Sequence, residues 1–130
     1  GRTTEWGSDG SLIPETGSTT LAITGPIELT LREANPNSGI SGAEINGIIL
    51  AMIADSTIRT DFSWAVHLSI LHTDHLNSIN FLYNELHNKS LPHEILHMKL
   101  ASSYRWATLL LRERPYFEVR HVKSHEINDD

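Results

Sequence analysis

Hydrophobic and polar residues in the first third of the chain follow the patterns of short strands. We expect a strand around Trp6 that runs into Asp9-Gly10-Ser11, where the glycine allows a sharp exit, after a frayed start over residues 1–5. Residues 19–24 are β-branched or apolar, and residues 27–32 alternate between apolar and polar as a half-buried antiparallel strand does. A Gly-Pro pair between these two segments predicts a hairpin.

The middle of the chain changes to the periodicity of a helix. Ser41 matches a helix N-cap, and the apolar residues between positions 43 and 53 form one broad face. Residues 55–61 are predicted to be a polar connection. Residues 65–72 are predicted to be a largely buried strand that ends at Thr73-Asp74, and this order of strand, helix and strand indicates a parallel crossover.

The last third predicts helices followed by one more strand. Residues 75–87 have an apolar face, residues 93–100 predict a short helix, and residues 104–113 predict another. Residues 116–123 alternate strictly and should form the last strand. The side chains expected to face inward from the first and the last of these helices are Leu76, Ile79, Leu82, Tyr83, Leu86, Trp106, Leu109 and Leu110.

Composition limits the function classes. The 130 residues include no cysteine, which excludes disulfides and thiolate metal sites and favours an intracellular protein. A length of 130 residues is that of one domain, so we expect a single domain over residues 1–130. No apolar run reaches the ~18 residues that a membrane span needs, so we expect no membrane partner. The net charge of −6 argues against unselective nucleic-acid binding.

The charge is nevertheless uneven. Residues 1–88 hold three basic and ten acidic residues, whereas residues 89–130 hold seven basic and six acidic ones. An acidic first part with a basic later surface suits an enzyme that holds cations at one place and phosphates at another. Asymmetry of this size is also common in proteins without such a function.

Three carboxylates and one histidine stand where predicted elements begin or end: Asp9, Glu44, Asp74 and His125. Asp74 follows a predicted strand, at the edge where open α/β sheets place their ligands. Acidic side chains that gather at one place repel one another unless they hold cations. The working hypothesis is therefore a metal-dependent phosphoryl-transfer site.

For Glu44 and Asp74, helix capping is an alternative to metal binding. Glu44 follows Ser41 by three residues, which is the spacing of a capping box. Asp74 precedes a predicted helix and would serve as its cap. The residues alone leave both alternatives open.

A second metal chemistry is suggested by His93-Glu94-Ile95-Leu96-His97, which matches H-E-x-x-H. On a helix the two histidines would share one face and bind zinc, with Glu94 as general base. Pro92, however, places His93 in the first helical turn, and the eleven residues after His97 supply no third histidine or glutamate. A zinc hydrolase is therefore the weaker alternative.

Taken together, four stretches in this order resemble the ribonuclease H family: Asp9-Gly10-Ser11, Ala43-Glu44, Thr73-Asp74 and Val122-Lys123-Ser124-His125. They extend from residue 9 to residue 125, and their spacing and predicted element types agree with the family. Two further strings are similar to the ribonuclease H domains attached to reverse transcriptases of fungal retroelements. These strings are Thr73-Asp74-His75-Leu76-Asn77-Ser78 and Ser103-Tyr104-Arg105-Trp106.

The resemblance implies a ribonuclease H-like α/β fold: a five-stranded mixed sheet, three antiparallel strands and then two parallel ones, flanked by helices. It implies hydrolysis of the RNA strand of an RNA–DNA hybrid by a domain fused to a reverse-transcriptase polymerase domain. Asp9 would bridge two Mg²⁺ ions, which Mn²⁺ can replace, and Glu44 and Asp74 would complete one side. His125 would help proton transfer or product release.

The resemblance also implies two sets of substrate contacts. Ser11, Ser41 and Asn46 would meet the backbone or the 2′-hydroxyl that distinguishes RNA from DNA. Basic residues in the second half would grip the DNA strand, and these are Lys89, Lys99 and Arg105.

One departure from the family pattern concerns a fourth carboxylate, which relatives carry on a helix after the histidine. Here Asn128-Asp129-Asp130 follow His125 almost at once. Either Asp129 or Asp130 supplies the ligand with altered geometry, or the ligand lies in chain beyond residue 130. Without it the second metal is weakly held, and the alternative function is a hybrid-binding module with little or no cleavage.

Overall fold

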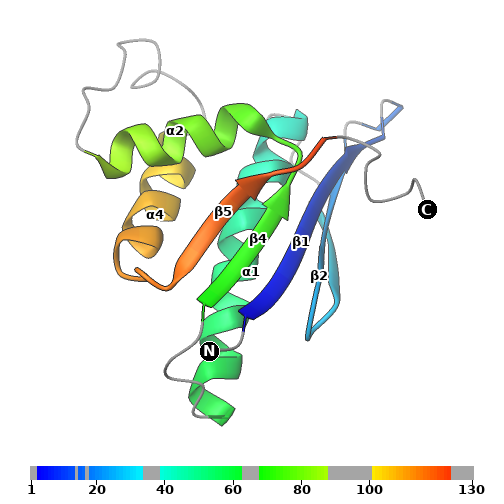
Figure 1. The fold of residues 1–130 in the computed structure, drawn as a ribbon. Helices are drawn as coiled ribbons and strands as arrows, with labels where there is room; N and C mark the ends of the chain where they lie inside the picture. Colours follow the sequence, from blue (N-terminus) through cyan, green and yellow to red (C-terminus); the bar gives the residue numbers. More distant parts are fainter. Residues whose placement is uncertain are drawn as a thin grey trace.

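The computed structural model describes residues 3–13, 15–16, 18–33, 39–62, 68–87 and 101–123. These residues form a five-stranded sheet in the order β3-β2-β1-β4-β5, with helices packed against it (Figure 1). The elements are β1 (Thr3–Leu12), β2 (Thr19–Thr24), β3 (Leu29–Glu33), α1 (Gly39–Phe62), β4 (Leu68–Thr73), α2 (Leu76–Leu86), α4 (Ala101–Arg112) and β5 (Phe117–His121).

The sheet is mixed, as predicted. β1 and β3 are both antiparallel to β2, whereas β4 lies parallel to β1 and to β5. The predicted hairpin between the second and third strands is thereby confirmed. The crossover from β3 through α1 delivers β4 to the far side of β1, so β1 occupies the centre of the sheet.

The bounds of β1 correct two expectations. Residues 3–5 are not frayed, because they pair with the first three residues of β4. Asp9 does not end the strand either, because β1 continues to Leu12. The pairing of β1 with β4 stops at Gly7 and His72, so the second half of β1 pairs only with β2 and leaves its other edge beside the end of β4.

Helix α1 is longer than expected at both ends. It begins at Gly39, so Ser41 lies in its first turn and is not the N-cap, and it continues through residues 55–61, which were predicted to be a connection. This segment remains helical because Asp55 and Ile58 are buried there. α1 packs on β1 and β2 and also against α4. The core around it includes Trp6, Ile23, Ile45, Ile48, Met52, Leu71, Leu82, Leu111 and Phe117.

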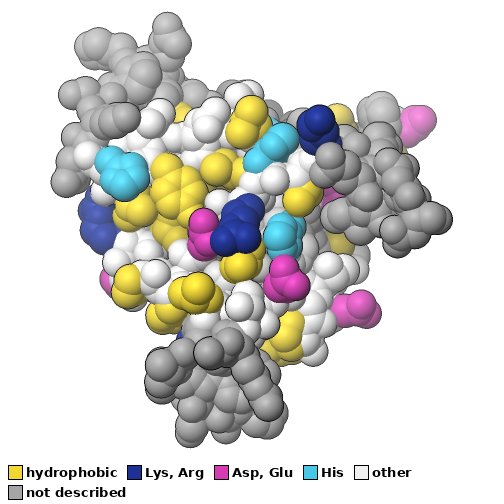
Figure 2. Space-filling view, viewed as in Figure 1, with side chains coloured by type: hydrophobic (Ala, Val, Ile, Leu, Met, Phe, Trp, Pro, Cys, Tyr) yellow, Lys and Arg dark blue, Asp and Glu magenta, His cyan; other side chains and the backbone are white. Residues whose placement is uncertain are grey.

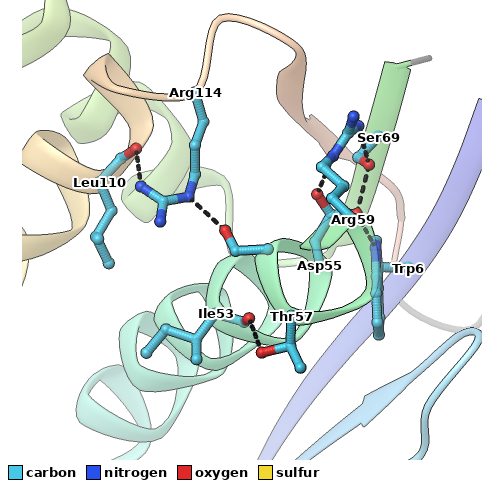
Figure 3. A network of polar contacts seen from close by, with 9 residues as sticks. Trp6, Ile53, Asp55, Thr57, Arg59, Ser69, Leu110 and Arg114 are labelled. Atoms are coloured by element: carbon cyan, nitrogen blue, oxygen red, sulfur yellow. Dashed lines mark hydrogen bonds and ion pairs between the residues drawn. The ribbon is translucent and has the colours of Figure 1, made fainter. Parts of the chain in front are cut away.

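A buried polar network secures the start of β4 (Figure 3). The Trp6 indole N–H donates to Asp55 Oδ1 at 3.0 Å, and the Ser69 hydroxyl donates to the same oxygen. Arg59 Nε donates to Asp55 Oδ2 at 2.8 Å, and its guanidinium lies 3.7 Å from the centre of the Tyr116 ring. A buried charge with this many partners is tolerated, whereas removing one partner is costly.

The sheet face opposite the core carries charged residues. The His72 and Glu5 side chains are 3.1 Å apart, and the Arg120 and Glu118 side chains are 2.9 Å apart. Figure 2 shows charged and histidine side chains mixed with hydrophobic ones on this side of the molecule. In the described residues, no helix is both long and apolar enough to cross a membrane.

Two predicted apolar faces are not buried. On β3, Leu29 and Leu31 are 40% and 47% exposed, because α1 packs on β1 and β2 and β3 lies beyond them at the edge of the sheet. On α4, Trp106 and Leu109 are 52% and 54% exposed, contrary to prediction. The buried face of α4 consists of Tyr104, Ala107, Thr108 and Leu111.

The α4 difference has a packing cause. α4 contacts both α1 and α2, so the side chains between them must be small where the helices approach closely. Ala107 and Thr108 meet that requirement, and their spacing from Tyr104 and Leu111 is also helical. Hydrophobic size alone therefore selected two exposed residues, Trp106 and Leu109, whereas Leu110 does pack against the core. The predicted helix over residues 93–100 lies outside the described residues.

Candidate metal centre

Three carboxylates meet beyond the end of β4. Asp9 lies on β1, Glu44 lies in the first half of α1, and Asp74 is the residue that follows β4. One carboxylate oxygen from each lies within 4.8 Å of the others. The structure thus brings together the three acidic residues that the sequence singled out.

Gly10 explains how α1 comes so close to β1. A Cβ atom on Gly10 would lie 3.0 Å from the Ala43 Cβ and 3.2 Å from Glu44 Oε1, which is tighter than ordinary contact. The missing side chain also leaves room for the Gly10 backbone N–H to donate to Glu44 Oε1 at 3.2 Å. The role of this glycine is a close approach, rather than the sharp strand exit that we predicted.

Both helix-capping alternatives are wrong. α1 begins five residues before Glu44, and the Glu44 carboxylate is directed to β1 and to the end of β4. The N-cap of α2 is His75, with no side-chain capping bond, so Asp74 does not occupy the cap position. Neither carboxylate is therefore explained by helix capping.

Glu44 is the electrostatically strained member of the cluster. Its side chain is buried, with the residue 5% exposed. Burial, followed by the charges of Asp74 and Asp9, raises the pKa of Glu44 to about 7, although the hydrogen bonds from the Gly10 N–H and the Thr73 hydroxyl lower it. A neighbouring cation stabilises the ionised form of a carboxyl group that is buried among like charges.

The donor set fits a hard divalent cation. All three side chains offer carboxylate oxygens, which Mg²⁺ and Mn²⁺ prefer, whereas structural and catalytic zinc sites are rich in nitrogen and sulfur. The burial of Glu44 among like charges supplies a reason for a cation to bind there. The residues present therefore fit the divalent metal that the sequence predicted.

Several residues behind the carboxylates were not predicted. The Thr73 hydroxyl is buried and donates to Glu44 Oε2 over a long 3.5 Å, and it accepts the His75 backbone N–H at 3.4 Å. The His75 ring bonds to Ser78, which in turn bonds to Tyr104. Burial lowers the pKa of His75, against the charge of Asp74. No motif marks these contacts, because the Thr73–Glu44 contact depends on how α1 approaches β4 and the Ser78–Tyr104 contact depends on how α2 packs against α4.

The other predicted site residues are more scattered. Ser11 is exposed on β1 two residues after Asp9, and Asn46 is half-buried on α1 two residues after Glu44. Arg105 is exposed on α4. The remaining candidates lie outside the described residues, apart from Ser41, which is placed only as part of α1: Lys89, Lys99, His125, Asp129 and the H-E-x-x-H string His93 to His97.

Comparison with known proteins rests on structure. No family model matches the sequence, and no curated protein matches it. A solved structure of the foamy viral protease-reverse transcriptase with dsDNA has a TM-score of 0.71 at 14% identity, covering 97% of this chain and 86% of that chain. A second, with RNA/DNA hybrid, has a TM-score of 0.74 at 13% identity, covering 96% of this chain and 18% of that chain.

A third solved structure has the same fold. LC11-RNase H1 in complex with RNA/DNA hybrid has a TM-score of 0.68 at 10% identity, covering 95% of this chain and 87% of that chain. The fold is that of ribonuclease H. In this ribonuclease H fold, β1, α1 and the end of β4 each supply one acidic residue to the cluster. The predicted fold class is confirmed.

Proposed function

We propose that this chain is a metal-dependent nuclease that hydrolyses the RNA strand of RNA–DNA hybrids. The observation that carries the proposal is the cluster of Asp9, Glu44 and Asp74 at the end of β4 in a ribonuclease H fold. The proposal is also supported by two solved structures of the same fold that contain an RNA/DNA hybrid.

The three carboxylates would hold Mg²⁺ or Mn²⁺. When bound, such an ion stabilises charge on the phosphate and lowers the pKa of a coordinated water. Asp9 and Asp74 are the solvent-accessible members, so they face the side from which a substrate phosphate arrives. Glu44 is buried behind them, and the Gly10 N–H fixes the orientation of its carboxylate.

The substrate contacts remain proposals. Ser11 and Asn46, each two residues from a cluster carboxylate, are proposed to contact the 2′-hydroxyl that distinguishes RNA from DNA. Arg105, exposed on α4, is proposed to contact the DNA strand together with Lys89 and Lys99. His125 is proposed to assist proton transfer or product release, and Asp129 to supply a fourth carboxylate.

We further propose that the chain works as one domain of a retroelement reverse transcriptase, fused to a polymerase domain. The support is its structural likeness to the foamy viral protease-reverse transcriptase, of which it spans 18%. The strings from Thr73 to Ser78 and from Ser103 to Trp106, which are similar to fungal retroelement domains, point to the same context.

The test is cleavage of a hybrid whose RNA and DNA strands carry different labels, in Mg²⁺, Mn²⁺ or EDTA. We expect cleavage of the RNA strand alone, and only with a divalent ion. Asp9→Asn and Asp74→Asn should each reduce cleavage by at least about a hundredfold, since each removes a ligand charge. Glu28→Gln, on the exposed turn before β3, is the matched carboxylate control and should cleave normally.

The other outcomes are informative. Tight hybrid binding without cleavage in either metal would replace the nuclease by a hybrid-binding module. Cleavage that survives Asp9→Asn or Asp74→Asn would refute the proposed site. Cleavage that persists in EDTA would refute the metal requirement.

A further inference from the structure

We propose that Tyr104 and Ser78 are positioning residues for the acidic cluster, because they hold His75 and thereby fix the neighbouring Asp74. The inference rests on the proposed function, since it assigns a role to residues behind the metal site. It concerns a line of side chains that runs from α4, through α2, to the short link between β4 and α2.

The line consists of two hydrogen bonds between buried or half-buried groups. The Tyr104 and Ser78 hydroxyl oxygens are 3.2 Å apart, and the Ser78 oxygen also bonds to His75 Nδ1. Ser78 is fully buried and Tyr104 is buried, so neither hydroxyl exchanges its partner for solvent. The Tyr104 ring packs against Phe81, with the two ring centres 4.4 Å apart, which fixes the hydroxyl in place.

The link that carries Asp74 is short. Thr73 ends β4 and His75 is the N-cap of α2, so Asp74 is the single residue between two anchors. On one side, the Thr73 hydroxyl contacts both Glu44 and the His75 backbone N–H. On the other side, the His75 ring is tied to Ser78.

This second anchor matters because the cluster repels its own members. Asp74 and Glu44 carry like charges at short range, and their repulsion drives the Asp74 carboxylate away from the others. A link that is free at His75 would turn and relieve that repulsion. Holding the His75 ring opposes this movement and keeps the Asp74 oxygen within reach of a shared cation.

The two nitrogens of His75 make the idea testable. Asn places a polar atom near the position of Nδ1, the atom that bonds to Ser78, whereas Gln places one near the position of Nε2. If the ring acts as an anchor, His75→Asn should retain function and His75→Gln should not. If His75 instead met the substrate through Nε2, the two variants would exchange their behaviour.

The experiment compares Tyr104→Phe and Ser78→Ala with Tyr83→Phe, which is the matched control. Tyr83 is a half-buried tyrosine on α2, and its hydroxyl accepts the Val119 N–H at 2.9 Å, so its loss costs stability in the same fold without touching the anchor. Mn²⁺ affinity is measured without substrate by electron paramagnetic resonance. Hydrogen exchange of the Asp74 and His75 amides is measured in the metal-free protein.

We expect Tyr104→Phe, Ser78→Ala and His75→Gln to weaken Mn²⁺ binding about tenfold, and Tyr83→Phe and His75→Asn to change it less than about twofold. Exchange at Asp74 and His75 should become faster in the first three variants only. Unchanged exchange and affinity in Tyr104→Phe and Ser78→Ala, an equal effect in Tyr83→Phe, or rescue by Gln instead of Asn would each overturn the inference.

Failure of the proposed function gives a different result. An unsubstituted chain that binds Mn²⁺ and cleaves no hybrid would refute the nuclease and leave the anchor to be judged on affinity and exchange. A chain that binds no Mn²⁺ would refute the metal site, and hydrogen exchange alone would then decide whether the anchor exists.

Discussion

At Glu44, burial and the charges of two aspartates act in the same direction. The pKa of this carboxyl group is about 7 in the folded protein, against an ordinary value of 4.5. Between these values the folded state binds more protons than the unfolded state. The contribution of Glu44 to the free energy of unfolding is therefore present below pH 4.5 and is lost as the pH rises through about 7.

We expect Glu44→Gln to remove this loss from the metal-free protein. The amide retains an oxygen for the Gly10 N–H and carries no charge at any pH. Urea unfolding in EDTA, at about pH 5 and about pH 8, should show a larger fall in stability for the unsubstituted chain than for the variant. If the unsubstituted chain and the variant lost the same free energy of unfolding between these two pH values, Glu44 would not be the strained group.

Thr19 allows a test on a buried polar group that carries no charge. It is fully buried at the start of β2, and its hydroxyl has no hydrogen-bond partner among the residues that the structure describes. Valine has nearly the same shape and needs no partner, so Thr19→Val should raise the free energy of unfolding by about 1 kcal/mol. Chemical denaturation measures the change, and a loss of stability would indicate that the hydroxyl is paired in solution.

Between elements, two glycines at the contact of α1 with β1 are predicted to respond oppositely to the same substitution. In Gly10→Ala the new methyl group would press on Ala43 and Glu44, so we expect a loss of about 1–3 kcal/mol and of metal binding. In Gly47→Ala the methyl group would lie 3.4 Å from the Ser8 Cβ, an ordinary contact, and alanine favours the helix by about 1 kcal/mol.

Thermal unfolding and Mn²⁺ titration of these two variants provide the comparison. The close approach of α1 would not matter to the site if Gly10→Ala bound Mn²⁺ normally. A destabilised Gly47→Ala would show instead that the helix cannot accept even a methyl group on this face.

The elements also show what the sequence could and could not predict. Alternation predicted β3 and β5, and β-branched and apolar content predicted β2 and β4, since a strand buried on both faces has no period-two pattern. The pattern failed for α1, where Asp55 suggested a loop and is instead paired with Trp6, 49 residues away in the sequence. A polar residue that is satisfied by a distant partner cannot be told from a solvent-exposed one by pattern alone.

The site was predicted in the same partial way. Asp9, Glu44 and Asp74 were identifiable because each stands near a predicted element end, where carboxylates that gather repel one another unless they hold cations, and because their stretches resemble the ribonuclease H family. Thr73, Ser78 and Tyr104 were not, because their contacts arise only when α1 approaches β4 and α2 packs against α4. Residues that touch a ligand leave a chemical signal in the sequence, whereas residues that hold them in place leave only a packing signal.

Across the whole molecule, the two ends of β4 separate stability from function. Asp55, which lies on α1 beside the start of the strand, is compensated by Arg59, Trp6 and Ser69. Asp74 at its other end joins a cluster of like charges. Because the buried charge beside the start of β4 is compensated by its partners, the fold can tolerate repulsion between the carboxylates at the other end of the strand, where a cation would relieve it.

Matched variants at the two ends should therefore have opposite effects. Ser69→Ala removes a partner of Asp55 and should lower the free energy of unfolding by about 1–3 kcal/mol while leaving the gain from Mg²⁺ unchanged. Asp74→Asn removes repulsion and should stabilise the metal-free protein at about pH 8, yet abolish most of the gain from Mg²⁺. Thermal unfolding with EDTA or Mg²⁺ measures both. If Asp74→Asn destabilised the metal-free chain, the acidic cluster would stabilise the fold. The carboxylates beyond the end of β4 would then not be under electrostatic strain.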